Sequence, residues 1–153
     1  MSWQQPKTDW EIKPRVNGMY NGDWFNLEDY ERITCNLATL QILGSNIYGA
    51  GIPSVGMPTR YRNEYPRAED FNAIENNLLS LVQKTIFPTG YEGRKNWAPN
   101  GPTPTVEDLN RIEGAIQKLH ENYYSVGNWT EFNPLDGDGL LTADGTLFLA
   151  LEV

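Results

Sequence analysis

The sequence predicts a mainly α-helical protein with three repeated amphipathic helices, long Gly- and Pro-rich loops, an extended aromatic N-terminal arm and a short C-terminal β-hairpin. Two observations lead to this prediction. A stripe of apolar residues, spaced three, four and three positions apart, occurs three times along the chain. Each copy also begins with a pair of carboxylates, which helix starts favour. We therefore divide the chain into an arm at residues 1–26, a helical domain at 27–130 and an assembly hairpin at 131–153.

The three helices are predicted at residues 27–43, 68–86 and 106–123. Because residues three and four positions apart lie on the same side of an α-helix, each stripe predicts one buried face. Three helices with the same apolar spacing are expected to share one core. The stripes consist of Tyr30, Ile33, Leu37 and Leu40, of Phe71, Ile74, Leu78 and Leu81, and of Leu109, Ile112, Ile116 and Leu119.

Each predicted helix carries an acidic pair in its first turn, where a carboxylate complements the exposed N–H groups and contributes about 0.3–1 kcal/mol. Paired carboxylates can also serve as a general acid and base. An active site is normally built once, however, whereas this pair recurs in the same helical phase, so we interpret it as a helix start. Asn26 and Thr105 are the predicted N-caps. The pairs are Glu28 and Asp29, Glu69 and Asp70, and Glu107 and Asp108.

The segments between the helices, residues 44–66 and 88–105, are longer than the usual connection in a helical bundle. Together they contain five aromatic residues, in which disordered linkers are poor, so we expect both segments to dock on a surface. That surface belongs to the protein's own helices, to a neighbouring subunit or to a ligand, and the sequence leaves these three possibilities open.

Both ends of the chain predict contacts with other subunits. The arm holds tryptophans among turn-forming Asn-Gly pairs, and such large side chains need a surface to bury against. The C-terminal stretch predicts a strand at 140–142, a turn at Asp144-Gly145 and a second, apolar strand at 146–153 whose open edge needs a cover. The predicted assembly interface consists of Trp3, Trp10, Trp24, Leu147, Phe148, Leu149 and Leu151.

Composition and charge disfavour several classes of function. A net charge of −8 repels a phosphate backbone, so we expect no direct nucleic-acid binding. No apolar run approaches the roughly 20 residues of a membrane span, and the first residues do not resemble a signal peptide. Cys35 is expected to be a small buried residue, and His120 is expected at the C-terminal end of the third helix. We find no pattern for a cofactor, a metal or a catalytic centre and predict that the protein is not an enzyme.

Two stretches carry a family resemblance, "PKTDW" at residues 6–10 and "FNLEDYERITCN" at residues 25–36. They resemble small virion structural proteins of phages and prophages of Gram-positive bacteria. The resemblance implies a non-enzymatic, multi-copy component of the tail tip or baseplate, or of an adjacent tail or neck layer. It implies a virion location, with other virion structural proteins and copies of the same chain as partners. Glu31 departs from the pattern, which has Asn here, as the later repeats do at Asn72 and Asn110.

The alternative hypothesis is a module that binds host cell-surface glycan. Tyr91 and Trp97 lie in the second long loop, and aromatic faces are common in ligand sites. The sequence favours core or interface positions for most aromatic residues, so glycan binding through Tyr91 and Trp97 stands as the second hypothesis.

Overall fold

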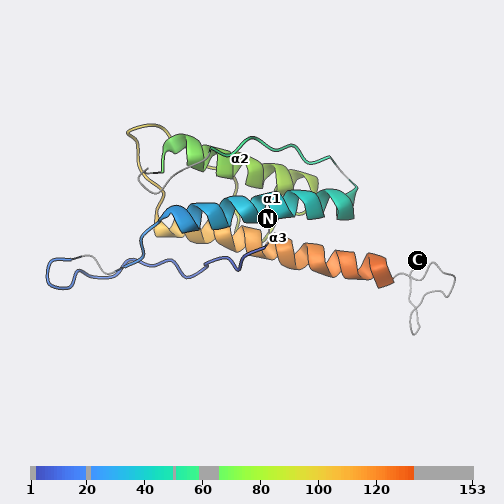
Figure 1. Ribbon diagram of the computed structural model, residues 1–153, viewed down its shortest axis with the longest axis horizontal. Coiled ribbons are helices and arrows are strands. Elements are labelled where there is room, and N and C mark those ends of the chain that lie inside the picture. The colour runs from blue at the N-terminus through green and yellow to red at the C-terminus, as the bar shows by residue number, and fades with distance from the viewer. Residues whose placement is uncertain (1–2, 20–21, 50, 59–65, 133–153) are drawn as a thin grey trace. The chain divides into compact units, whose positions relative to one another are not determined.

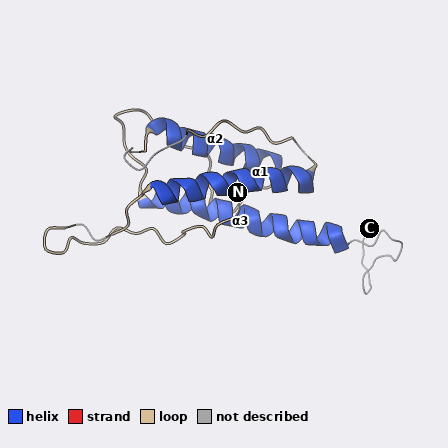
Figure 2. Ribbon diagram, viewed as in Figure 1, coloured by secondary structure: helices blue, strands red, loops and turns tan. Residues whose placement is uncertain are grey.

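Three helices make up most of the described structure. The computed structural model describes residues 3–19, 22–49, 51–58 and 66–132, with side chains of the third helix up to Gly127. The helices are α1 at Leu27–Tyr48, α2 at Ala68–Lys84 and α3 at Val106–Phe132. Because no strand occurs within the described ranges, the prediction of a mainly α-helical protein with three helices is confirmed (Figure 2).

The chain forms two compact units, residues 1–120 and 121–153, and α3 continues from the first into the second. The first unit holds the arm, α1, α2 and the N-terminal part of α3. The strands predicted at 140–142 and 146–153 lie outside the residues that the structure describes.

Within the first unit, α1, α2 and the N-terminal part of α3 run in the same direction, so their N-terminal ends lie together (Figure 1). Two parallel helices can be joined only by a chain that returns along their length. With 17 residues at 1.5 Å each, α2 is about 25 Å long. The Gly- and Pro-rich segments are long because they make this return, and hydrogen bonds attach them to the protein's own helices.

Each acidic pair contains a buried aspartate that closes the start of its helix. Asp29, Asp70 and Asp108 are 7%, 0% and 3% exposed. Each accepts the backbone N–H of the residue three positions earlier, at 3.0, 2.7 and 2.9 Å. In return, the side chains of Asn26 and Thr105 accept the N–H groups of Asp29 and Asp108. The predicted N-caps are therefore confirmed, and Asp replaces the usual Glu of the capping box.

Two predicted helix ends are wrong. α1 continues through the buried Gly44 and ends at Tyr48, where Gly49 adopts a φ of 65°. A helical Gly is only about 1 kcal/mol less favourable than Ala, so Gly44 does not stop the helix, whereas a left-handed Gly49 does. α3 continues beyond Tyr123 to Phe132, and His120 consequently lies inside the helix rather than at its end.

The three apolar stripes form the predicted core. All of their side chains are at most 6% exposed, and the isoleucines Ile33, Ile74 and Ile112 are 0% exposed. These three isoleucines occupy the same place in the repeat, four residues after the buried aspartate of each helix. The repeat in the sequence therefore corresponds to a repeat in the packing.

Two ion pairs connect α3 to its neighbours at corresponding positions. Arg32 of α1 donates Nε and Nη2 to Glu113 of α3 at 2.8 and 2.7 Å. Arg111 of α3 donates through both terminal nitrogens to Glu75 of α2. Both glutamates are 0% exposed, and each Arg follows the buried aspartate of its helix by three residues.

The ion pairs follow a cyclic order, from α1 to α3 and from α3 to α2, as expected for three equivalent helices arranged with approximate threefold symmetry. The remaining step, from α2 to α1, would place Arg at position 73 and Glu at position 34. The chain has Ala73 and Thr34 there instead. Since both charged members are absent together, no charge is left buried without a partner, which would destabilise the fold strongly.

Acid is expected to weaken the start of α3. Burial raises the pKa of Asp108, but hydrogen bonds from Lys95 and Thr105 outweigh it, so this pKa lies below the ordinary 3.8. A depressed carboxylate pKa stabilises the fold above the ordinary value, and the contribution disappears as pH falls through the folded-state value. Asp108→Asn should therefore flatten the decline of the urea midpoint below about pH 4. Glu107→Gln, at the exposed neighbour, is the control, and equal pH slopes in the two variants would contradict the prediction.

Candidate assembly surface

The N-terminal segment at residues 3–10 lies along α1 and α3 and is held by its backbone. Asn36 of α1 accepts the N–H of Gln4 at 2.8 Å and donates to the Gln4 carbonyl at 2.7 Å. Asn110 of α3 forms the same two bonds with Trp10 at 2.9 and 3.0 Å. We call the place where this segment docks the arm site, defined by Asn36, Asn110 and Glu113.

Glu113 is the charged centre of the arm site. Its carboxylate accepts the indole N–H of Trp10 at 2.8 Å and the backbone N–H of Lys7 at 3.0 Å, in addition to the guanidinium of Arg32. The hydrogen bond to Glu113 raises the pKa of Arg32, although burial opposes the change. Glu113 therefore joins α1, α3 and the docked segment through one buried group.

The two return segments repeat this arrangement. Asn72 of α2 exchanges two hydrogen bonds with the backbone of Trp97, both at 2.8 Å, and the Trp97 indole N–H donates to Glu75 at 3.3 Å. Asn77 of α2 holds the backbone of Val55 in the same way, at 2.8 and 3.1 Å. Three extended segments are thus fixed to the helices by the same type of contact.

Residues 11–19 and 22–23 form a hairpin that leaves the bundle (Figure 1). Val16 and Met19 exchange both backbone hydrogen bonds, at 2.8 and 2.9 Å. Between them, Asn17 and Gly18 have φ angles of 53° and 78°. Positive φ at both central positions is typical of the type I′ turn, for which Asn-Gly is a preferred pair.

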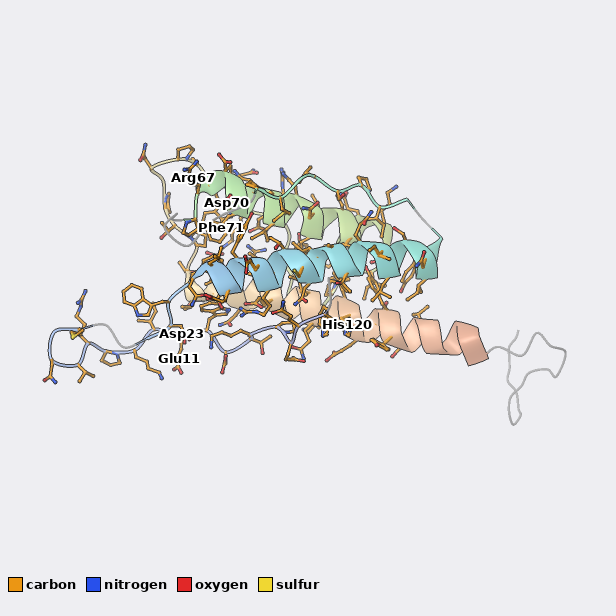
Figure 3. The ribbon with its side chains drawn as sticks, in the orientation of Figure 1. Glu11, Asp23, Arg67, Asp70, Phe71 and His120 are labelled. Carbon is orange, nitrogen blue, oxygen red and sulfur yellow. The ribbon has the colours of Figure 1, made fainter. Side chains whose placement is uncertain are left out.

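Glu11 and Asp23 close the base of this hairpin and lie beside each other in Figure 3. The Glu11 N–H donates to the Asp23 carboxylate at 2.8 Å, and the Asp23 N–H donates to the Glu11 carbonyl at 3.2 Å. The ammonium of Lys7 lies 3.6 Å from Asp23. These contacts are partly exposed to solvent, so each contributes modestly to closing the hairpin.

Large apolar side chains lie in solvent along the hairpin and at its end. Ile12, Val16, Met19 and Trp24 are 68%, 52%, 71% and 67% exposed. We call these four residues the hairpin patch. Apolar side chains grouped on a protruding element are typical of a surface that contacts another protein.

The residues predicted as an assembly interface fall into three groups. Trp24 belongs to the hairpin patch. Trp10 is 4% exposed in the arm site, and Trp3 stacks on His120 with ring centroids 3.6 Å apart. Both of these tryptophans therefore pack against their own chain. The remaining predicted residues, which lie outside the described part of the chain, are Leu147, Phe148, Leu149 and Leu151.

The two residues of the glycan hypothesis differ in accessibility. Tyr91 is 1% exposed, and burial together with nearby Glu75 raises its pKa, so its ring offers no face to a sugar. Trp97 is half-buried and lines an open groove of about 550 Å³ with Phe71 and residues 98–104, which include three prolines. This volume is within the range of small-ligand sites, about 300–1,000 Å³.

Among the described residues, no group of His, Cys, Asp and Glu is arranged to hold a metal ion. None of the helices in that part of the chain is both long and apolar enough to cross a membrane. No family model, curated protein or solved structure matches the chain.

Sequence reasoning missed the polar contacts of the repeat and the exposed face of the hairpin. The signal for the contacts was present, because Asn recurs at two fixed positions after the buried aspartates. The signal for the hairpin was the Asn17-Gly18 pair between Val16 and Met19. Residues in the missed contacts are Arg32, Asn36, Asn72, Glu75, Asn77, Asn110, Arg111 and Glu113.

Asn110→Ala is expected to loosen the docked segment and to lower the free energy of unfolding by about 1–3 kcal/mol, because it leaves two backbone groups of Trp10 without their partner. Quenching of tryptophan fluorescence by acrylamide should increase. Asn46→Ala, at an exposed position of α1, is the matched control. Equal quenching in the two variants would show that Asn110 does not hold the segment.

Proposed function

We propose that the protein is a non-enzymatic phage virion structural protein that mediates subunit assembly as a multi-copy component of the tail tip or baseplate, or of an adjacent tail or neck layer. The observation that carries the proposal is the hairpin patch. Its apolar side chains remain in solvent although the helices of the same chain bury their stripes almost completely. A partner surface is the natural cover for such a patch.

The use of the charged residues supports a structural role. The buried aspartates close the helix starts, and the buried glutamates Glu75 and Glu113 pair with Arg111 and Arg32. The aspartates, whose acidic pairs could be interpreted from sequence as a general acid and base, and the two buried glutamates are thus all engaged in closing helix starts or joining helices. The resemblance of "PKTDW" and "FNLEDYERITCN" to virion proteins is the reason for proposing a phage virion as the assembly to which the protein belongs.

The test is the mass in solution, by light scattering at micromolar concentration, of the wild type and of a variant with Val16→Thr and Met19→Ser. We expect a defined oligomer for the wild type and a smaller species for the variant, because the variant removes apolar area from the hairpin patch. Ile42→Ser, on an exposed site of α1, is the control and should leave the mass unchanged. A wild type that is monomeric and binds no virion protein would contradict the proposal.

The groove beside Trp97 favours one second candidate, recognition of host cell-surface glycan. In this hypothesis the half-buried Trp97 provides the aromatic surface, since Phe71 and Tyr91 are 6% and 1% exposed and too deeply buried to take part. A glycan array probed with the wild type and with Trp97→Ala tests it, with Trp24→Ala as the control. Glycan binding through Trp97 is supported if Trp97→Ala, but not Trp24→Ala, fails to bind glycans that the wild type binds. The hypothesis is excluded if the folded wild type binds no glycan on the array.

A further inference from the structure

We propose that copies of the protein assemble by exchanging their N-terminal segments, so that residues 3–10 of one copy occupy the arm site of a second copy. This inference rests on the proposed assembly function and specifies its mechanism. It arises from two juxtaposed features, a docked segment held through its backbone and a hairpin that connects this segment to α1.

The docked segment is bound at the arm site in the way that an extended peptide ligand is bound, mainly through its backbone. Five hydrogen bonds join the backbone of Gln4, Lys7 and Trp10 to side chains of the helices. The indole of Trp10 adds a sixth, to buried Glu113. Because these partners belong to α1 and α3, the same bonds form with an identical segment from another copy.

Only this one of the three docked segments can be exchanged without moving a helix. The segments held by Asn77 and Asn72 each connect two helices of the bundle, so their removal would displace a helix. Residues 3–10 precede α1 and are linked to it through residues 11–25. At about 3.3 Å per residue, this linker spans roughly 50 Å when extended, which is ample for reaching a neighbour.

The hairpin is the hinge of the exchange. Opening it breaks the contacts between Val16 and Met19 and between Glu11 and Asp23, and keeps every bond of the arm site. In the closed chain Ile12, Val16 and Met19 lie in solvent. In an exchanged dimer the two opened linkers run antiparallel and cover these side chains. Exchange of identical elements gives a closed twofold dimer in which both interfaces are the same.

Gly18→Val tests the hinge by destabilising the closed turn. Val disfavours the φ of 78° that Gly18 adopts, while a Cβ at this position meets no neighbour within 4 Å, so the expected effect is on the turn. We expect the dimer dissociation constant to fall by roughly tenfold or more. An unchanged or weaker association would overturn the proposal.

A disulfide between Val16→Cys and Met19→Cys, in a Cys35→Ser background, tests the opposite direction. The two positions form a hydrogen-bonded antiparallel pair, whose Cα spacing of about 5.5 Å suits a disulfide. The oxidised variant should be monomeric by light scattering, and reduction should restore the dimer. If the oxidised variant associates as the wild type does, exchange is wrong while the assembly function stands. If neither the wild type nor Gly18→Val associates, both exchange and self-assembly are wrong.

A cross-link between Gln5→Cys and Gln117→Cys, again with Cys35→Ser, shows directly whether the docked segment and the α3 that it contacts belong to the same chain. The two glutamine side chains are hydrogen-bonded at 3.3 Å, so a short bismaleimide joins the segment to whichever α3 it occupies. The dimer fraction from gel filtration should yield covalent dimers on a denaturing gel, and the monomer fraction should not. Covalently closed monomers from the dimer fraction would overturn the proposal.

Discussion

Glu113→Ala is expected to lower the free energy of unfolding by about 3–5 kcal/mol, because it removes one partner of a buried ion pair. Glu113 is 0% exposed and accepts hydrogen bonds from Arg32, from the indole of Trp10 and from the backbone of Lys7. Without it, Asp29, 2.9 Å from the guanidinium of Arg32, remains as its acidic neighbour among the described residues. The packing of α1 against α3 and the docking of residues 3–10 should weaken together.

Urea denaturation followed by far-UV circular dichroism measures this loss, and fluorescence of the docked tryptophan should report it at a similar midpoint. Glu107→Ala, at an exposed position in the first turn of the same helix, is the control and should lower stability by no more than about 1 kcal/mol. Glu113→Gln separates charge from shape, since the amide can replace only part of the hydrogen bonding. If Glu113→Ala lowers the free energy of unfolding no more than the control does, Glu113 does not hold α1, α3 and residues 3–10 together.

Replacement of Ile33, Ile74 or Ile112 by Ala is expected to cost about 2–5 kcal/mol in each case. All three side chains are fully buried and occupy equivalent places in the three helices. Approximate threefold symmetry therefore predicts three similar losses, within about 1 kcal/mol of each other, from cavities of similar shape.

Chemical denaturation of the three variants, compared at a common m-value, tests this equivalence. Ile42→Ala in α1 is the matched control, since Ile42 is 60% exposed and its truncation leaves no internal cavity. Losses that differ by several kcal/mol among the three isoleucines would show that the repeat in the sequence does not extend to the energetics of the core.

The repeated stripes and acidic pairs allowed the existence, number and starts of the helices to be predicted. These features depend on residues three and four positions apart, which a single sequence displays directly. The helix ends were less well predicted. The prediction stops the first helix before Gly44 although Gly weakens a helix only slightly, and it ends the third helix too early although the sequence has Asn133-Pro134, a stop signal, directly after Phe132. Cys35, predicted to be buried, is half-buried.

The candidate site was predictable only in part. Trp24 was identified as a candidate interface residue and is exposed, whereas Trp10 and Trp3 pack within their own unit. An aromatic residue in an irregular segment gives no indication of which surface covers it. That choice depends on Asn110 and on His120, which lie far along the chain from the tryptophans they contact.

By itself, the sequence determined the three helices, their capped starts and the face that each one buries, because these follow from interactions within one or two helical turns. Only the tertiary structure decided that the helices run parallel, that the long segments return along them, and that Arg and Glu pair in a cyclic order. The contact between Asn110 and Trp10 joins residues 100 positions apart. Such a contact depends on where packing brings two distant segments, and the local pattern of residues does not encode that position.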